Sequence, residues 1–106
     1  MNDVELVIDN RERSRFELTA GDDVAFAAYE QSGSVIIFIH TEVPEAFRGQ
    51  GVGAKLARAA LDSARKRGLQ VVPLCPFIAA YIRRHPDYLD LVSESNRRRL
   101  NLETAS

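Results

Sequence analysis

The stretch Arg48-Gly49-Gln50-Gly51-Val52-Gly53 is the most informative part of this 106-residue chain. It lies between an apolar run that is typical of a strand and a pattern that is typical of an amphipathic helix. Glycines let the backbone come close to a ligand because they carry no side chain. The first turn of a helix offers unpaired N–H groups and the positive end of the helix dipole. The stretch therefore predicts a site for a phosphate or a pyrophosphate.

Two common nucleotide-binding motifs do not fit this stretch. A Walker A loop requires Gly-x-x-x-x-Gly-Lys-Ser/Thr, whereas Gly53 is followed by Ala54-Lys55-Leu56. A Rossmann loop follows the strand that opens its domain, whereas several short strand-like segments precede the glycines here. The pattern that fits is Arg-x-x-Gly-x-Gly, at Arg48, Gly51 and Gly53.

The composition indicates a single soluble domain. Hydrophobic residues make up 45% of the chain and charged residues 27%, which is ordinary for a globular protein. No apolar run approaches the ~20 residues of a membrane span, and the acidic start at residues 1–5 lacks the layout of a signal peptide. One cysteine excludes a disulfide framework and a cysteine-rich metal site. We therefore expect a cytoplasmic protein with no metal site and no membrane partner.

Charge is unevenly distributed, although the net charge is only −1. Residues 1–46 contain ten acidic and three basic residues, whereas residues 47–106 contain five acidic and eleven basic residues. A polyanionic cofactor beside the glycine loop explains the basic half, and so does a set of solvated side chains on helices. The basic residues are accompanied by no series of stacking aromatics and no helix-turn-helix pattern. Nucleic acid is therefore not expected as a partner.

The first part of the chain reads as a series of strands with no helix before residue 44. Alternating apolar and polar residues predict three strands, and a continuous apolar run predicts a fourth strand that is central and buried on both faces. These strands cover residues 4–9, 15–19, 24–29 and 35–39.

The second part reads as a helix, a strand and a short helix. Val52, Leu56, Ala60 and Ala64 line one face of the first helix, with Ala57 and Leu61 beside them, and Gly68 is expected just after its end. Residues 69–74 then form a strand parallel to the strand at 35–39, as in a βαβ crossover. Pro73 has no N–H for a neighbouring strand, so it is expected at a sheet edge or where two strands separate.

Three stretches in this order resemble the GNAT superfamily, and within it the short YjdJ-like group of N-acetyltransferase domain proteins. They are residues 40–44, the loop at 48–53, and residues 71–77 together with 81–86. The resemblance covers roughly residues 4–92, so residues 1–92 are expected to form one domain, and residues 93–106 a frayed helix or disordered tail. It implies an α+β fold: a mostly antiparallel sheet in which parallel central strands splay apart, with acyl-CoA in the gap.

The resemblance also implies an activity and a set of site residues. The cofactor is acetyl-CoA or CoA, and the reaction moves the acetyl group to an amine, with proteins and peptides among the candidate acceptors. The backbone of Thr41, Glu42 and Val43 is expected along the pantetheine arm. Cys75, Phe77 and Tyr81 are expected near the thioester. The pyrophosphate is expected within the loop and the start of the helix, at Arg48, Gly49, Gln50, Gly51, Val52, Gly53 and Ala54.

One departure from the family concerns the acceptor. Typical members have two helices between their first and second strands, and these helices form much of the acceptor site. Only residues 10–14 separate those strands here. Two other functions therefore stay open: a non-catalytic acyl-CoA-binding module, and a partner subunit that docks on a larger complex through an exposed sheet face. The sequence identifies neither the acceptor nor the oligomeric state.

Acyl transfer needs a group that accepts the proton of the amine and an acid that protonates the leaving thiolate. Glu42 is the candidate base because it follows the central strand and shares a face with His40; a solvated carboxylate is the alternative. The resemblance makes Tyr81 the candidate acid, with a core aromatic as the alternative and Tyr88 as a weaker candidate. Cys75 is either a small buried hydrophobe or a nucleophile that takes the acetyl group covalently.

Overall fold

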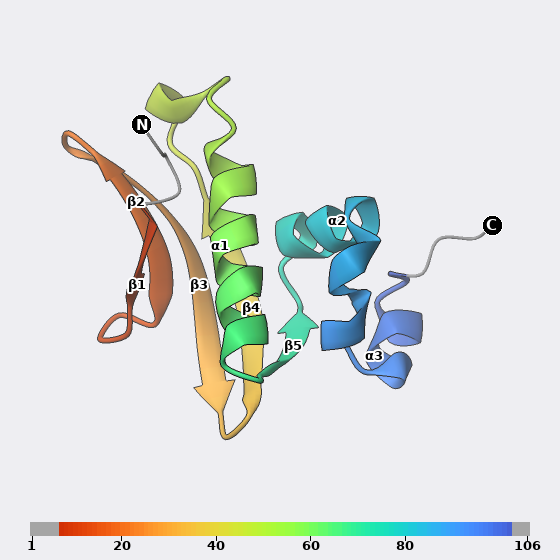
Figure 1. Ribbon diagram of the computed structural model, residues 1–106. Helices are drawn as coiled ribbons and strands as arrows, with labels where there is room; N and C mark the ends of the chain where they lie inside the picture. Colours follow the sequence, from red (N-terminus) through yellow and green to blue (C-terminus); the bar gives the residue numbers. More distant parts are fainter. Residues whose placement is uncertain (1–6, 103–106) are drawn as a thin grey trace.

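This computed structural model describes residues 7–102, which form a five-stranded sheet. Figure 1 shows the longest helix lying across the sheet, with the later helices grouped beyond its last strand. The strands follow one another across the sheet in chain order. β1 to β4 pair antiparallel, and β5 pairs with β4 in parallel. The expected α+β fold class is confirmed. The strands are β1 (Val7–Asn10), β2 (Arg15–Ala20), β3 (Asp23–Ser32), β4 (Val35–Glu42) and β5 (Gln70–Pro73).

The predicted strands and turns at the start of the chain are confirmed within the described residues. A short turn at residues 11–14 joins β1 to β2, and no helix occurs between residues 7 and 44. Residues 4–6 of the first predicted strand lie outside the described residues. β5 lies at the edge of the sheet and its pairing with β4 ends at Pro73, so both places expected for Pro73 coincide. The parallel pair is therefore at one end of the sheet order and not at its centre.

Three α-helices and two 3₁₀ helices complete the described chain. They are η2 (Glu45–Phe47), α1 (Val52–Lys66), α2 (Pro76–Arg84), η3 (Pro86–Leu91) and α3 (Glu94–Arg99). The predicted apolar face of α1 is buried in full, at Val52, Leu56, Ala57, Ala60, Leu61 and Ala64. Gly68 follows the C-cap residue Arg67 with a φ of 69°, as expected. No helix among residues 7–102 has the length and apolar character that a membrane span requires.

The core lies between the sheet and α1, with α2 beside α1 on the same side of the sheet. Pairs such as Phe16 with Ala27 and Leu18 with Ala25 are directly opposite each other on neighbouring strands, and all four are buried. Alternate residues of each strand point the other way. On that second face most strand side chains are exposed or only partly buried, because the described helices pack on the first face.

The prediction that β4 is buried on both faces is wrong. Ile36 and Phe38 are fully buried under the helices, whereas Val35 and Ile37 are only partly buried and Ile39 is 42% exposed. The apolar run therefore serves a strand with one covered face. A second layer of helices would be needed to bury the other face.

The prediction of a frayed or disordered tail needs correction for residues 93–102. The Ser93 hydroxyl caps α3 by accepting a hydrogen bond from the backbone N–H of Asn96 at 3.2 Å. Leu102 is fully buried in the main core. The burial of an apolar side chain anchors this segment, which therefore folds with the rest of the domain. Residues 103–106 lie outside the described part of the chain.

The anchoring role of Leu102 is testable by truncating its side chain. We expect Leu102→Ala to lower the free energy of unfolding by about 2–5 kcal/mol, because it removes a fully buried side chain and leaves a cavity. Urea denaturation followed by circular dichroism measures this. Leu74→Ala is the control, because Leu74 is 51% exposed and should change stability little. Equal stability of the two variants would contradict the packing of the C-terminal segment.

Candidate functional site

The glycine loop at residues 48–53 leads into α1 with an open helix start. Gly51 is the N-cap residue and adopts a left-handed conformation with a φ of 68°, and Gly49 has a φ of 79°. No side chain caps the helix at Gly51, and the first turn of α1 contains no acidic residue. The N–H groups at this end and the positive helix dipole therefore face the loop with no carboxylate from the helix itself. Arg48, the first residue of the loop, forms an exposed ion pair with Glu45 at 2.7 Å. This is the arrangement that an anionic phosphate needs.

Gly53 is needed for a different reason: an aromatic ring lies so close to it that a side chain would not fit. A Cβ atom built on Gly53 would lie 2.6 Å from Cζ of Phe77. Phe77 is in the first turn of α2 and is 41% exposed, so its ring lies over the start of α1 and still reaches solvent. Two residues that were predicted for the same site are thus in contact, although 24 positions separate them in the sequence.

A gap opens between β4 and β5 where their pairing ends. The last pair of the parallel ladder is Phe38 with Pro73. The backbone N–H of Cys75 then donates to the carbonyl oxygen of Phe38 at 2.9 Å, and the chain turns away into α2. β4 continues to Glu42 and pairs only with β3, up to the pair Phe26 with Glu42. Along residues 39–42, the side of β4 that faces the gap has no strand partner among the described residues. This is the splay that the resemblance implied.

An irregularity in β4 decides which side chains face the helices. Tyr29 of β3 is opposite Phe38, and the preceding residue Ala28 is opposite His40, so Ile39 is an extra residue on β4. Because of this bulge, Thr41 points to the helix side, whereas His40 and Glu42 point to the opposite face of the sheet. The expected shared face of His40 and Glu42 agrees with their contact, in which His40 Nε2 lies 3.5 Å from Glu42 Oε1.

Thr41 and Cys75 meet across the base of the gap. Thr41 Oγ1 lies 3.2 Å from Cys75 Sγ, and Cys75 is only 2% exposed. The thiol is thus buried and has a hydrogen-bond partner. These features agree with a packing role for Cys75, one of the two interpretations that the sequence left open.

Tyr81 lines a groove between the start of α1 and α2. The groove has a volume of about 150 Å³ and is lined by Ala54, Phe77, Ala80, Tyr81, Arg84 and His85. The Tyr81 ring stacks on His85 with 4.1 Å between ring centroids. Burial raises the pKa of the Tyr81 hydroxyl, so this group keeps its proton at neutral pH.

A wider hollow of about 410 Å³ continues this groove along α1. Its lining includes the candidate acids Tyr81 and Tyr88, and also Arg58 and Asp62, which sequence reasoning missed. The Tyr88 hydroxyl donates to Asp62 Oδ1 at 2.7 Å. Burial, followed by this hydrogen bond, raises the pKa of Tyr88. The spacing of Arg58 and Asp62 matches one turn of α1, but it is also typical of any solvated helix face.

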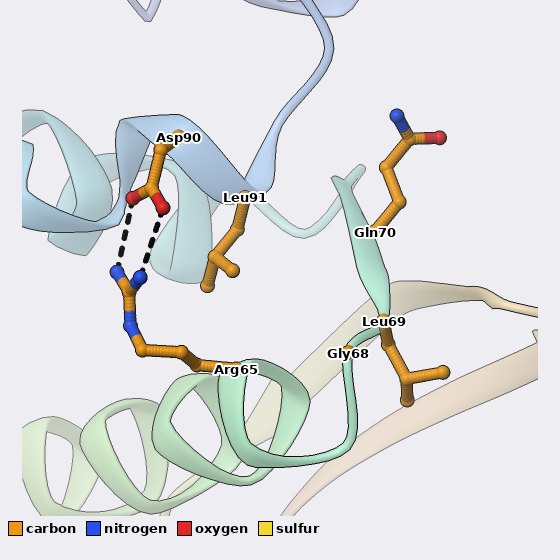
Figure 2. A pocket seen from close by; sticks show the side chains of 6 residues that line it. All are labelled: Arg65, Gly68, Leu69, Gln70, Asp90 and Leu91. Atoms are coloured by element: carbon orange, nitrogen blue, oxygen red, sulfur yellow. Dashed lines mark hydrogen bonds and ion pairs between the residues drawn. The ribbon is translucent and has the colours of Figure 1, made fainter.

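A third hollow lies at the C-terminal end of α1, away from the glycine loop. Figure 2 shows its lining, in which the Arg65 guanidinium donates to both carboxylate oxygens of Asp90, at 2.8 and 3.0 Å. The volume is about 390 Å³. Because the two charges satisfy each other, this contact serves to hold η3 against α1. Its place at the opposite end of α1 separates it from the loop by roughly 20 Å, given the 1.5 Å rise of a helix.

Beyond the loop itself, the structure brings six of the predicted residues into two groups and leaves Glu42 apart. Gly53, Ala54, Phe77 and Tyr81 line the entrance between α1 and α2. Thr41 and Cys75 meet at the base of the gap. The Glu42 side chain lies on the other face of the sheet. Within residues 7–102 no group of three His, Cys, Asp or Glu side chains is arranged to hold a metal ion.

Comparison with known proteins gives consistent matches. The family model of GCN5-related N-acetyltransferases matches residues 15–91. The protein NATD1 of Mus musculus is 38% identical over 80 residues, which cover 73% of each chain. NATD1 of Danio rerio is 33% identical over 85 residues, or 77% of each chain. A GCN5-like protein from Staphylococcus aureus, solved by NMR in solution, superposes with a TM-score of 0.66 at 25% identity, covering 88% of this chain and 91% of that one.

The contact between Gly53 and Phe77 gives a testable prediction. We expect Gly53→Ala to push the Phe77 ring away from α1, because the added methyl group would lie too close to it. Unfolding free energy should change by less than about 1 kcal/mol, since the ring is partly exposed. Nuclear Overhauser contacts between residue 53 and the Phe77 ring measure the displacement. If these contacts persist in Gly53→Ala at their original strength, the close approach is wrong.

Proposed function

The chain belongs to the family of GCN5-related N-acetyltransferases, and we propose that it binds acetyl-CoA and transfers the acetyl group to an amine. One observation carries the proposal: the uncapped start of α1, entered through left-handed Gly49 and Gly51, lies beside a groove that Tyr81 and Phe77 line. A pyrophosphate fits the helix start because it needs N–H donors and positive potential. An amide-containing arm fits the edge of β4 that has no partner strand.

The residues that would hold the cofactor follow from this arrangement. The backbone from Arg48 to Ala54 would hold the pyrophosphate. The backbone of residues 41–43 would hold the pantetheine arm along the gap, with the side chains of Phe77 and Tyr81 beside it. Acetyl-CoA, when bound, supplies the acetyl group as a reactive thioester.

The proton steps would be divided between the two faces of the sheet. The Glu42 carboxylate lies at the end of β4 and would accept a proton from the incoming ammonium group, with His40 beside it at 3.5 Å. The Tyr81 hydroxyl has a raised pKa and so holds the proton that an acid must supply. We propose direct transfer, because the Cys75 thiol is buried against Thr41. Cys75 would then have a packing role.

Cofactor binding is tested by straining the loop. We expect Gly51→Val to weaken acetyl-CoA binding by about 5- to 30-fold, because a β-branched residue opposes the left-handed conformation that the loop uses, at a cost of roughly 1–2 kcal/mol. Isothermal titration calorimetry measures the affinity. Gly33→Val is the matched control, since Gly33 has a φ of 59° but lies in the turn between β3 and β4. Equal affinity in both variants would place the site elsewhere.

Catalysis is tested by comparing two side chains near the gap. With an amine that the wild-type protein acetylates, we expect Tyr81→Phe to slow turnover by about 10²-fold or more, because general acid catalysis is typically worth that much. Cys75→Ala should keep most of the activity. The release of free CoA thiol, followed with a chromogenic reagent, measures the rate.

Two outcomes would overturn parts of this proposal. An acetyl adduct on Cys75 that forms and decays at the catalytic rate, seen by mass spectrometry of the intact protein, would replace direct transfer. Tight acetyl-CoA binding without turnover of any amine in a broad panel of amines, peptides and proteins would instead indicate a non-catalytic acyl-CoA-binding module.

A further inference from the structure

The sheet face that α1 and α2 leave uncovered has a distinct composition. We call this surface the open sheet face; its members that matter here are Arg15, Glu17, Phe26, Glu30, His40 and Glu42. Each lies on a strand and points away from the apolar core, as the register of β2, β3 and β4 requires. Glu17 is only 8% exposed, whereas the other five are partly or fully exposed. Apolar residues such as Ile37 lie among them and are only partly buried.

Strand register places an aromatic ring between two carboxylates. Glu17 of β2, Phe26 of β3 and Glu42 of β4 are directly opposite one another in a row across the sheet. The next row contains Arg15 and His40, on either side of Ala28. The His40 ring meets Phe26 edge-on, with 6.1 Å between centroids. The acidic row ends at the gap between β4 and β5.

This surface already holds one cationic side chain. The Arg15 guanidinium lies 4.4 Å from the centroid of the Phe26 ring, and its Nε donates to Glu17 at 2.5 Å. Glu17 thereby balances the charge of Arg15, and the pKa of the Glu17 carboxyl is lowered mainly by this hydrogen bond. The contact shows how a cation is satisfied on this face: an aromatic ring under the charge and a carboxylate at its edge.

The remaining charges leave the open sheet face negative. Among its described strand residues there are three glutamates, Glu17, Glu30 and Glu42, against one arginine. Arg15 and, from the turn before β2, Arg13 both act on Glu17. Glu30 and Glu42 therefore set the sign of the rest of this surface. An incoming lysine would place its methylene groups on the apolar strand residues and its ammonium group near these carboxylates.

We propose that the open sheet face docks a lysine-rich segment of the acceptor, so that one lysine reaches the gap past Glu42. This inference rests on the proposed function and adds the class of acceptor and the face by which it arrives. Glu42 connects the open sheet face with the gap between β4 and β5. It belongs to that face and follows Thr41, whose side chain lies at the gap. The surface thus replaces the acceptor helices that the short turn at residues 11–14 leaves no room for.

Charge complementarity argues against the other occupants. A second copy that paired through the same face would bring Glu30 and Glu42 against a surface of the same sign, which is unfavourable. An acidic segment or nucleic acid would meet the same repulsion. A cationic polypeptide gains attraction that is strongest at low salt.

A peptide titration tests the inference without the need for turnover. The uniformly ¹⁵N-labelled chain is titrated with a blocked hexapeptide of alternating alanine and lysine, and in parallel with the same peptide carrying glutamate in place of lysine. We expect the lysine peptide alone to shift backbone amide signals of Phe26, His40 and Glu42, with an affinity that falls as salt rises. Absence of shifts, or shifts confined to the helices, would overturn the inference.

A charge-matched pair of variants tests whether the effect is local. Glu30→Gln/Glu42→Gln should weaken peptide binding by about three- to tenfold, since exposed charges each contribute modestly. Glu12→Gln/Asp22→Asn is the control, because it removes the same charge from the turns beside the sheet and should bind like the wild type. If both variants weaken peptide binding equally, binding depends only on the net charge of the protein, and the inference is overturned.

A parallel titration with acetyl-CoA separates this inference from the proposed function. Shifts around residues 48–54 with acetyl-CoA, together with no shifts from the lysine peptide, would retain the proposed function and remove the docking surface. Binding of the lysine peptide without any binding of acetyl-CoA would retain the surface and remove the acetyltransferase. A concentration-dependent dimer in sedimentation, with amide shifts on the same face, would show that a second copy of the chain occupies this face. The inference of a lysine-rich acceptor would then be overturned.

Discussion

The early end of the β4–β5 ladder is the constraint on which the rest of the structure depends. β5 has only four residues, and its last residue, Pro73, cannot donate a hydrogen bond to a neighbour. The N–H of Cys75 makes one more bond to Phe38, and the chain then enters α2 at Pro76, a residue suited to the first turn of a helix. Pro73, which lacks an N–H, thus ends the strand, and Pro76 starts the helix. Because the chain turns away between them, residues 39–42 of β4 have no strand partner on that side among the described residues.

The bulge at Ile39 turns this gap into a boundary between two environments. Without the extra residue, the side chain of His40 would follow Ile36 and Phe38 to the helix side of the sheet. With it, Thr41 faces the buried Cys75, and the side chains of His40 and Glu42 face solvent. A group held in the gap would thus have protein on one side and an accessible carboxylate on the other. Burying His40 and Glu42 under α2 would instead leave two polar groups to be desolvated.

Local sequence patterns predicted the elements well, because their physical causes are local. The apolar spacing of α1, its end at Gly68 and the glycines at its start each follow from the residue and its immediate neighbours. The burial of β4 on both faces was predicted wrongly, because a continuous apolar run does not reveal how many layers of helices cover the sheet. The bulge at Ile39 carries no glycine to mark it. Leu102 is buried through contacts with residues distant in the sequence, which a segment rich in arginine and serine does not suggest.

The candidate site was predicted in part for the same reason. The loop at residues 48–53 carries its chemistry in its own backbone, so its motif identified it. The approach of Phe77 to Gly53 depends on how α2 packs against α1, which the sequence motif does not show. The stacking of Tyr81 on His85 likewise depends on side-chain conformation.

The fold also explains the uneven charge along the sequence. The acid-rich half of the chain forms β1 to β4, and the basic half begins at the loop and supplies the described helices. Because layers of secondary structure are about 10 Å apart and charges are screened over about 8 Å at physiological salt, the two sides of the sheet can keep potentials of opposite sign. An anion at the start of α1 and a cation on the open sheet face would then each meet favourable charge, with the gap between β4 and β5 as the place where they come together.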